Sequence, residues 1–261
     1  MKNKLLSVPA IRLFLTLALA VGTVTVRSQT DTQNVKSNVV LVHGAFADGS
    51  SWAKLIPILQ SKGYNVVAVQ LPLTSFCGDV ATVRREIART SGPVILVGHS
   101  YGGAVITEAG SDPRVDSLVY VAAFAPDKGE SALSLSQAAP APTSDELRPD
   151  SKGFLKLTDR GIKGDLAPDL SLEEVALLTA AQAPTSADAL SALITNPAWK
   201  NKPSWYIIAA NDRAIAPTSE RSMAVRIGAS TSTVPSSHVV MLSHPKEVAA
   251  VIDAAGQLQK H

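Results

Sequence analysis

The chain has 261 residues, of which 46% are hydrophobic and 18% are charged, as is ordinary for a globular protein. This length can bury one large core, and the composition excludes a mostly disordered chain or a solenoid of repeats. The formal net charge is +2, and the single cysteine, Cys77, excludes an internal disulfide. Because no motif supports Cys77 as a nucleophile, we expect a buried or half-buried small side chain there.

The first 28 residues predict a secretory signal peptide. Three basic residues precede residues 13–26, which are 14 uncharged residues followed by polar sequence. Cleavage is expected after Ser28, with the small residues of Ala18–Ala20 as a competing site. A membrane anchor is the alternative, but the stretch falls short of the ~20 residues that a spanning helix needs.

Removal of residues 1–28 changes the charge balance. Four basic residues and no acidic ones are lost, so the 24 basic residues become 20 against 22 acidic, a net charge of about −2. Nothing then favours nucleic acid or an anionic membrane as a partner. We expect an exported protein, periplasmic or secreted, with residues 29–37 as a flexible lead-in and no stable membrane insertion after cleavage.

Five apolar runs predict buried strands, at residues 38–43, 65–70, 94–97, 115–123 and 204–210, and residues 230–234 predict a last short strand. Helical patterns separate them, at residues 51–60, 78–89, 104–109, 217–227 and 245–258. Strands that alternate with helices indicate an α/β fold with a mostly parallel central sheet flanked by helices. In such a sheet the functional site lies at the carboxyl ends of the strands.

The segment 131–201 differs in character from the rest. It contains helical patterns at 172–181 and 187–194 but no run typical of a strand. We therefore expect a small helical cap inserted into a core formed by residues 38–130 and 202–261, and this cap would select the substrate. Alanine, proline and serine crowd residues 136–151, for which a disordered linker is the alternative.

Gly98-His99-Ser100-Tyr101-Gly102 joins a predicted strand directly to a predicted helix. This arrangement is typical of a nucleophile elbow, in which a sharp turn exposes a serine hydroxyl above the sheet. The bare Gly-x-Ser-x-Gly pattern is weak by itself, and the strand-to-helix setting strengthens it. Ser100 is therefore the candidate nucleophile.

A serine hydroxyl needs a histidine to accept its proton and a carboxylate to hold that histidine. In this architecture the three follow the order serine, acid, histidine. Asp212 follows a late strand, and His238 lies in the loop after the last strand. A turn that uses the Asp212 side chain alone is the alternative for that residue.

The other histidines fit the role of base less well. His43 and His99 flank glycine turns at strand ends, where we expect them to shape the backbone. His244 begins a helix, and His261 ends the chain.

Attack on an acyl carbon also requires N–H donors for the oxyanion. Tyr101, which follows the nucleophile, and Ala45, in the loop after the first strand, are the expected donors. Phe46 and Phe124 are candidates to line a substrate pocket, as is Trp52, although aromatic residues are more often core.

These motifs together resemble the α/β-hydrolase superfamily, most closely its small bacterial esterase-like members, which are similar to plant methylesterases and hydroxynitrile lyases. The resemblance covers about residues 38–258 and rests on His43–Phe46, Gly98–Gly103, Tyr120–Pro126, Asn211–Pro217 and Ser237–Pro245. It implies the α/β-hydrolase fold, a triad of Ser100, Asp212 and His238, and oxyanion donors at Ala45 and Tyr101. It implies no cofactor and no metal.

The sequence departs from the lyase branch of that superfamily. Gly44 stands where the lyases place threonine, and Val239 stands where they place lysine. Members with an aspartate nucleophile are also disfavoured by Ser100. The expected activity is hydrolysis of small to medium, mainly apolar esters or lactones through an acyl-enzyme. Acyl transfer or perhydrolysis on the same triad, and a receptor-like binding protein with little turnover, are the alternatives.

Overall fold

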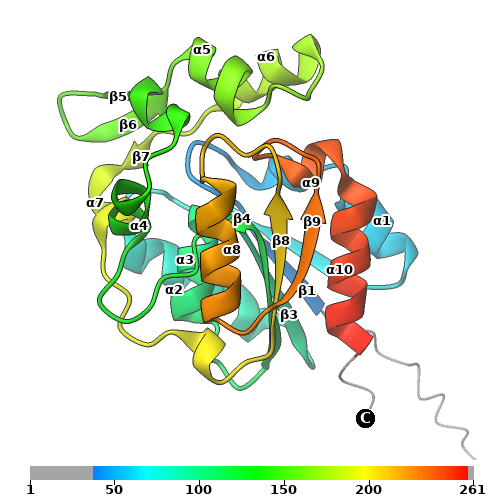
Figure 1. Cartoon of the computed structure of the whole chain (residues 1–261). Helices are drawn as coiled ribbons and strands as arrows, with labels where there is room; N and C mark the ends of the chain where they lie inside the picture. Colours follow the sequence, from blue (N-terminus) through cyan, green and yellow to red (C-terminus); the bar gives the residue numbers. More distant parts are fainter. Residues whose placement is uncertain (1–37, 258–261) are drawn as a thin grey trace, which may run out of the picture. The chain divides into compact units, whose positions relative to one another are not determined.

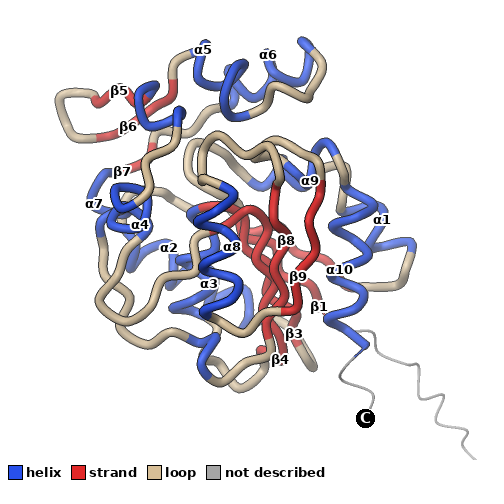
Figure 2. Tube along the Cα trace, viewed as in Figure 1, coloured by secondary structure: helices blue, strands red, loops and turns tan. Residues whose placement is uncertain are grey.

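A six-stranded sheet forms the centre of the computed structural model, which describes residues 38–257 (Figures 1 and 2). The expected signal peptide and lead-in lie outside these residues. The strand order is β2-β1-β3-β4-β8-β9, and every pairing in this sheet is parallel. The strands are β1 (Asn38–Val42), β2 (Asn65–Val69), β3 (Val94–Ser100), β4 (Val115–Ala123), β8 (Ser204–Ala209) and β9 (Ser230–Val234). The predicted mostly parallel α/β sheet is confirmed.

The burial of the strands follows from their sequences. Every residue of β1 and of β8 is buried, because helices cover both faces of a parallel sheet and leave no solvated side. Val40 and Val42 pack in one hydrophobic cluster, while Val39 and Leu41 pack in the other. The edge strand β9 is mostly serine and threonine and is largely exposed. The other edge strand, β2, is apolar in sequence but only partly buried.

Helices cover the two faces of the sheet. The helices α2 (Phe76–Arg89), α3 (Tyr101–Ala109) and α8 (Pro217–Arg226) pack on one face. The other face is covered by α1 (Ile56–Ser61) and α10 (Pro245–Gln257), with the short α9 (Val240–Ser243) beside them (Figure 1).

Residues 51–60 do not form the single helix that was predicted. A 3₁₀ turn, η1 (Gly49–Trp52), comes first, and the Asp48 side chain caps it by accepting a hydrogen bond from the Ser50 amide. Helix α1 then begins at Ile56, with Pro57 in its first turn. Proline has no amide hydrogen, so it belongs at a helix start rather than inside a helix.

The insertion contains strands as well as helices, so the expectation that it lacks strands is wrong. Strands β5 (Leu147–Pro149), β6 (Phe154–Leu157) and β7 (Thr185–Ser186) form a small antiparallel sheet. They are two to four residues long, too short to show an alternating apolar pattern. A turn joins the first two: the Asp150 carboxylate accepts the Lys152 and Phe154 amides, and Gly153 has φ +80°.

Helical segments complete the insertion, whose strands β5 and β6 lie beyond the carboxyl ends of β8 and β9 (Figure 1). They are α4 (Ala132–Ala138), η2 (Pro142–Glu146), α5 (Asp159–Gly161), η3 (Ile162–Leu166), α6 (Leu172–Ala181), α7 (Ala187–Ser191) and η4 (Ala198–Lys200). Residues 136–151 contribute to α4, η2 and β5, so the linker alternative is wrong.

Cys77 is exposed, which contradicts the expected buried or half-buried side chain. The residue lies in the first turn of α2, and the inward face of that helix is formed by Phe76 and Val80 instead.

Within residues 38–257, no helix combines the length and the apolar character needed to cross a bilayer.

Candidate active site

Ser100 lies at the junction of β3 and α3 in a backbone conformation that is rare outside glycine. Its φ is 52° and its ψ is −124°, so the chain turns sharply between strand and helix and lifts the side chain away from both. Adjacent β4 supports the turn, because the Phe124 amide donates to the Ser100 carbonyl at 3.1 Å.

The glycines around this turn are required by close backbone approach. A Cβ on Gly98 would come within 2.6 Å of the Gly102 carbonyl oxygen, and one on Gly102 within 2.5 Å of the Val42 carbonyl oxygen. A Cβ on Gly44 would lie 2.8 Å from the Cβ of Ser100. The loop after β1 therefore reaches the serine only because residue 44 has no side chain.

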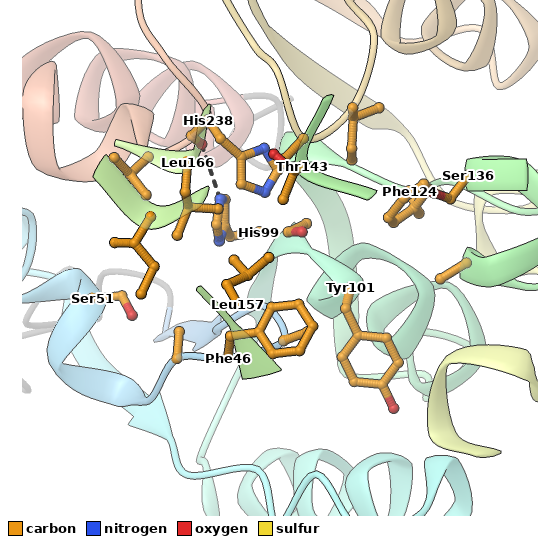
Figure 3. Close-up of a pocket in the computed structure, with 18 of the residues that line it drawn as sticks. Phe46, Ser51, His99, Tyr101, Phe124, Ser136, Thr143, Leu157, Leu166 and His238 are labelled. Carbon is orange, nitrogen blue, oxygen red and sulfur yellow. Dashed lines mark hydrogen bonds between the residues drawn. The ribbon is translucent and has the colours of Figure 1, made fainter. Parts of the chain in front are cut away.

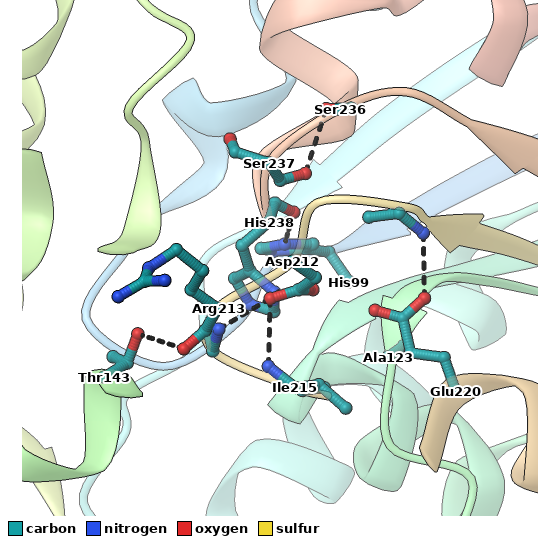
Figure 4. A network of polar contacts seen from close by, with 12 residues as sticks. His99, Ala123, Thr143, Asp212, Arg213, Ile215, Glu220, Ser236, Ser237 and His238 are labelled. Carbon is teal, nitrogen blue, oxygen red and sulfur yellow. Dashed lines mark hydrogen bonds and ion pairs between the residues drawn. The ribbon is translucent and has the colours of Figure 1, made fainter. Parts of the chain in front are cut away.

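Asp212 and His238 form a buried pair at the ends of β8 and β9. The Nδ1 atom of His238 and Oδ2 of Asp212 are 2.6 Å apart (Figure 4). The other carboxylate oxygen, Oδ1, accepts hydrogen bonds from the amides of Ala214 and Ile215. The turn and the histidine partner are thus not alternatives for Asp212, because each uses one oxygen.

Burial alone would raise the pKa of Asp212, but the charge and hydrogen bond of His238 outweigh it, and the pKa falls below its usual value. The carboxylate is therefore ionised at neutral pH. An ionised acceptor at Nδ1 fixes the proton of a neutral imidazole on that atom and leaves Nε2 free to accept another proton.

His99 lies beneath His238 in the fully buried layer under the site. Its Nε2 atom is 3.0 Å from the His238 carbonyl oxygen, and the two rings are 4.6 Å apart (Figure 3). Burial and the charge of His238 lower the pKa of His99 to about 3. A neutral His99 that donates from Nε2 supports the backbone of residue 238, as a shaping role predicts.

His43 orients the loop that carries Ala45. Its Nε2 atom accepts the Leu71 amide at 3.0 Å, so the ring proton is on Nδ1, which lies 2.8 Å from the Gly44 carbonyl oxygen. The carbonyl of residue 44 and the amide of Ala45 belong to one trans peptide and point in opposite directions. Holding that carbonyl therefore turns the Ala45 amide away from His43.

Ser100 and His238 line one cavity, whose empty space is about 990 Å³ with the open solvent at its mouth included. Figure 3 shows His238 in its wall. Ala45, Tyr101, Phe46 and Phe124 also line it, whereas Trp52 is fully buried in the core. Apolar residues of the insertion and of α9 form much of the remaining wall: Ala132, Leu133, Leu147, Leu157, Ile162, Leu166, Leu178, Leu190, Met241 and Leu242. The other polar side chains in the wall are uncharged serine, threonine and glutamine, with His99. Among the described residues, no Asp, Glu, Lys or Arg contributes to this wall, so the cavity suits an uncharged ligand.

Two buried acids near the site were not singled out by the sequence. Asp79 is fully buried: its carboxylate accepts the Tyr101 hydroxyl at 2.7 Å and the Leu73 amide at 2.9 Å. Glu220 is fully buried beside Asp212 and accepts the Ala209 amide at 2.9 Å. Burial first and the negative charge of Asp212 second raise the pKa of Glu220 well above its usual value. No sequence motif marks either acid, because their partners are distant along the chain or on another element.

No group of three or more histidine, cysteine, aspartate or glutamate side chains in residues 38–257 is arranged to hold a metal ion.

Comparison with known proteins gives a family match over residues 39–251, to the family described as "Alpha/beta hydrolase family". The alpha/beta hydrolase nvfD of Aspergillus novofumigatus is 27% identical over 85% of this chain and 98% of its own. The carbendazim hydrolyzing esterase of a Nocardioides species is 34% identical over 38% of this chain. That match spans less than half of the relative, 47% of its length.

Solved structures show the same fold. Polyneuridine aldehyde esterase superposes with a TM-score of 0.74 at 21% identity, over 84% of this chain and 98% of that one. A pyrethroid hydrolase superposes with a TM-score of 0.73 at 22% identity, over 87% of this chain and 100% of that one. These likenesses and the family match confirm the expected fold and resemblance.

Proposed function

The chain belongs to the alpha/beta hydrolase family, and on that premise we propose that it is a serine esterase for uncharged, mainly apolar esters or lactones of small to medium size. The observation that carries the proposal is the joint placement of Ser100 and the Asp212–His238 pair. Ser100 stands in a strained elbow, and the histidine of the hydrogen-bonded pair opens onto the same cavity.

In the proposed reaction, Nε2 of His238 removes the proton of Ser100 as the hydroxyl oxygen attacks the ester carbon. Asp212 stabilises the imidazolium that forms. The amides of Ala45 and Tyr101 stabilise the oxyanion; the Tyr101 amide is free for this because the first amides of a helix have no partner within it. His238 then protonates the departing alcohol, and water activated by the same histidine hydrolyses the acyl-enzyme.

The substrate class follows from the walls of the cavity. An apolar wall without ionised side chains favours a neutral ligand, because a charged one would lose its hydration without a partner. Two relatives are hydrolases by name, a carbendazim hydrolyzing esterase and a pyrethroid hydrolase, and the first name supports ester hydrolysis.

The test measures hydrolysis of p-nitrophenyl acetate and palmitate, with Ser100→Ala beside the matched control Ser91→Ala at an exposed serine. The expected result is that Ser100→Ala lowers kcat by at least about 10³-fold, while Ser91→Ala retains the wild-type rate. Faster turnover of acetate would indicate a compact acyl site, and preference for palmitate a lipase-like one. If Ser100→Ala and Ser91→Ala lose the hydrolysis rate equally, or both retain it, Ser100 is refuted as the nucleophile.

The same assay separates the alternatives. If added alcohol or peroxide captures most of the acyl group, the enzyme is an acyltransferase or perhydrolase. Binding of esters without turnover by the wild type would instead favour a receptor-like role.

We also propose export to the periplasm or the medium, and this proposal rests only on the apolar stretch at residues 13–26. Mass spectrometry of the protein recovered outside the cytoplasm would show a new N-terminus near residue 29. Recovery of the uncleaved chain in the cytoplasm would refute it.

A further inference from the structure

The insertion is hydrogen-bonded to all three loops that carry the proposed catalytic groups. We propose that Thr185, Thr143 and Asp169 of the insertion are positioning residues, which hold the oxyanion loop, the acid loop and the histidine loop in their reactive arrangement. This inference rests on the proposed function for the roles of those loops. It assigns the insertion a part in the chemical step beyond that of a wall around the substrate.

The oxyanion loop is held by Thr185 of β7. The hydroxyl of this fully buried threonine accepts the amide of Phe46 at 3.0 Å. Phe46 directly follows Ala45 and has φ 61°, a strained conformation that a fixed partner at its amide helps to maintain. The next residue of the insertion, Ser186, donates its amide to the Leu73 carbonyl at 2.8 Å. Thus both residues of β7 are hydrogen-bonded to the core.

The acid loop is held by Thr143 of η2. Both the amide and the hydroxyl of Thr143 donate to the carbonyl of Arg213, at 3.0 and 2.8 Å (Figure 4). Arg213 directly follows Asp212, and its guanidinium also pairs with Asp165 of the insertion at 2.7 Å. The exposed ion pair contributes little by itself, so the two bonds to the carbonyl are the main restraint.

The histidine loop is held by Asp169, between η3 and α6. Its carboxylate accepts the amide of Ser237 at 2.9 Å and the hydroxyl of Ser237 at 2.5 Å. The Ser236 hydroxyl also lies 3.3 Å from it. Both serines are buried and directly precede His238. Hydrogen bonds to an ionised acceptor are stronger than neutral ones, so Asp169 restrains the segment that fixes where the imidazole stands.

Contact with the ligand does not account for Thr185 and Asp169, whereas Thr143 also lines the cavity. Neither Thr185 nor Asp169 belongs to the cavity wall within the described part of the chain. Each contact reaches a residue next to a proposed catalytic group: Phe46, Arg213 and Ser237 adjoin Ala45, Asp212 and His238. Since displacement of a reacting group by 1 Å can cost about 100-fold in rate, restraints at these neighbours act on kcat.

The experiment uses the full mature chain with Thr185→Val and Asp169→Ala. Thr185→Ser keeps the hydroxyl and serves as the rescue variant. The matched controls are Thr179→Val and Asp188→Ala, in the same insertion: Thr179 bonds only within α6, and Asp188 is exposed in α7. Each variant is measured for kcat and KM on p-nitrophenyl acetate, for thermal unfolding, and for hydrogen–deuterium exchange of residues 43–49 and 235–240.

The expected result is a fall in kcat of about 10- to 100-fold for Thr185→Val and Asp169→Ala, with KM changed by less than about twofold. Thr185→Ser and both controls remain near the wild type. Exchange should rise in 43–49 for Thr185→Val and in 235–240 for Asp169→Ala, each in its own loop only.

Unchanged exchange in both loops would overturn the proposal. It would also be overturned if only KM changed while kcat did not, or if the control variants lost as much kcat. Because exchange needs no turnover, an inactive wild type would refute the esterase while the exchange data still decide whether the insertion restrains these loops.

Discussion

Replacement of Glu220 by glutamine should stabilise the protein, and the gain should grow as the pH rises. Glu220 is fully buried beside Asp212 and near the buried Tyr206. The positive charge of Arg221 lowers the pKa of Glu220, but this effect is small beside those that raise it. Burial and the Asp212 carboxylate raise its pKa well above the usual value. Glutamine can still accept the Ala209 amide through its carbonyl oxygen and donate toward Asp212, but it carries no titrating proton.

The sign follows from proton counting. In the unfolded chain, Glu220 loses its proton above a pH of about 4.3, whereas the folded protein keeps it. The unfolded state therefore binds fewer protons between its own pKa and the higher folded pKa, so stability falls as the pH rises through that window. For one group the slope is about 1.4 kcal/mol per pH unit. In a protein of this size, that is roughly 3 to 6 °C in Tm per pH unit.

The assay is thermal unfolding of the wild type and Glu220→Gln at half-unit steps from pH 4 upward, with Glu173→Gln at an exposed glutamate as the control. The difference in Tm between Glu220→Gln and the wild type should be small at pH 4 and should rise with pH. A difference that does not depend on pH would refute the reasoning, because it would mean that the folded protein does not hold the Glu220 proton.

Two further substitutions test the packing around the elbow. Tyr101→Phe removes the hydroxyl that donates to the buried Asp79 carboxylate, and it should cost about 1 to 3 kcal/mol in urea unfolding; an unchanged midpoint would contradict this. Gly103→Ala would press a Cβ against the Phe124 carbonyl oxygen and should cost about 1 to 3 kcal/mol. Gly164→Ala, whose Cβ would meet nothing within 4 Å, is the control, and equal losses in the two would contradict the steric account.

The sequence predicts the central sheet well because its inner strands are buried on both faces. A run such as Val94–Val97 must be apolar throughout when helices cover both sides, and this leaves a pattern that can be read directly. The elbow at Ser100 is predictable for a related reason, since close backbone approach restricts Gly98 and Gly102 to one residue type.

The insertion could not be predicted to the same depth. Its strands are too short for a period-two pattern, and β7 has only two residues. Thr185 and Asp169 gain their partners at Phe46 and Ser237, which are 139 and 68 residues away along the chain. Threonine, serine and aspartate are common on any surface, so nothing local distinguishes the ones that bind a distant loop. The protonation of Glu220 depends in the same way on a fold that brings it beside Asp212.

The exposed thiol of Cys77 makes the protein convenient for site-specific labelling. Because it is the chain's single cysteine, a maleimide dye attaches at one position, in the first turn of α2, without any prior mutation. Helix α2 packs against α7 of the insertion, so a second probe placed in the insertion would form a distance pair across that contact. Energy transfer between the two would then follow any movement of the insertion during turnover. The same thiol can form a disulfide only with another molecule, so preparations need a reductant to avoid covalent dimers.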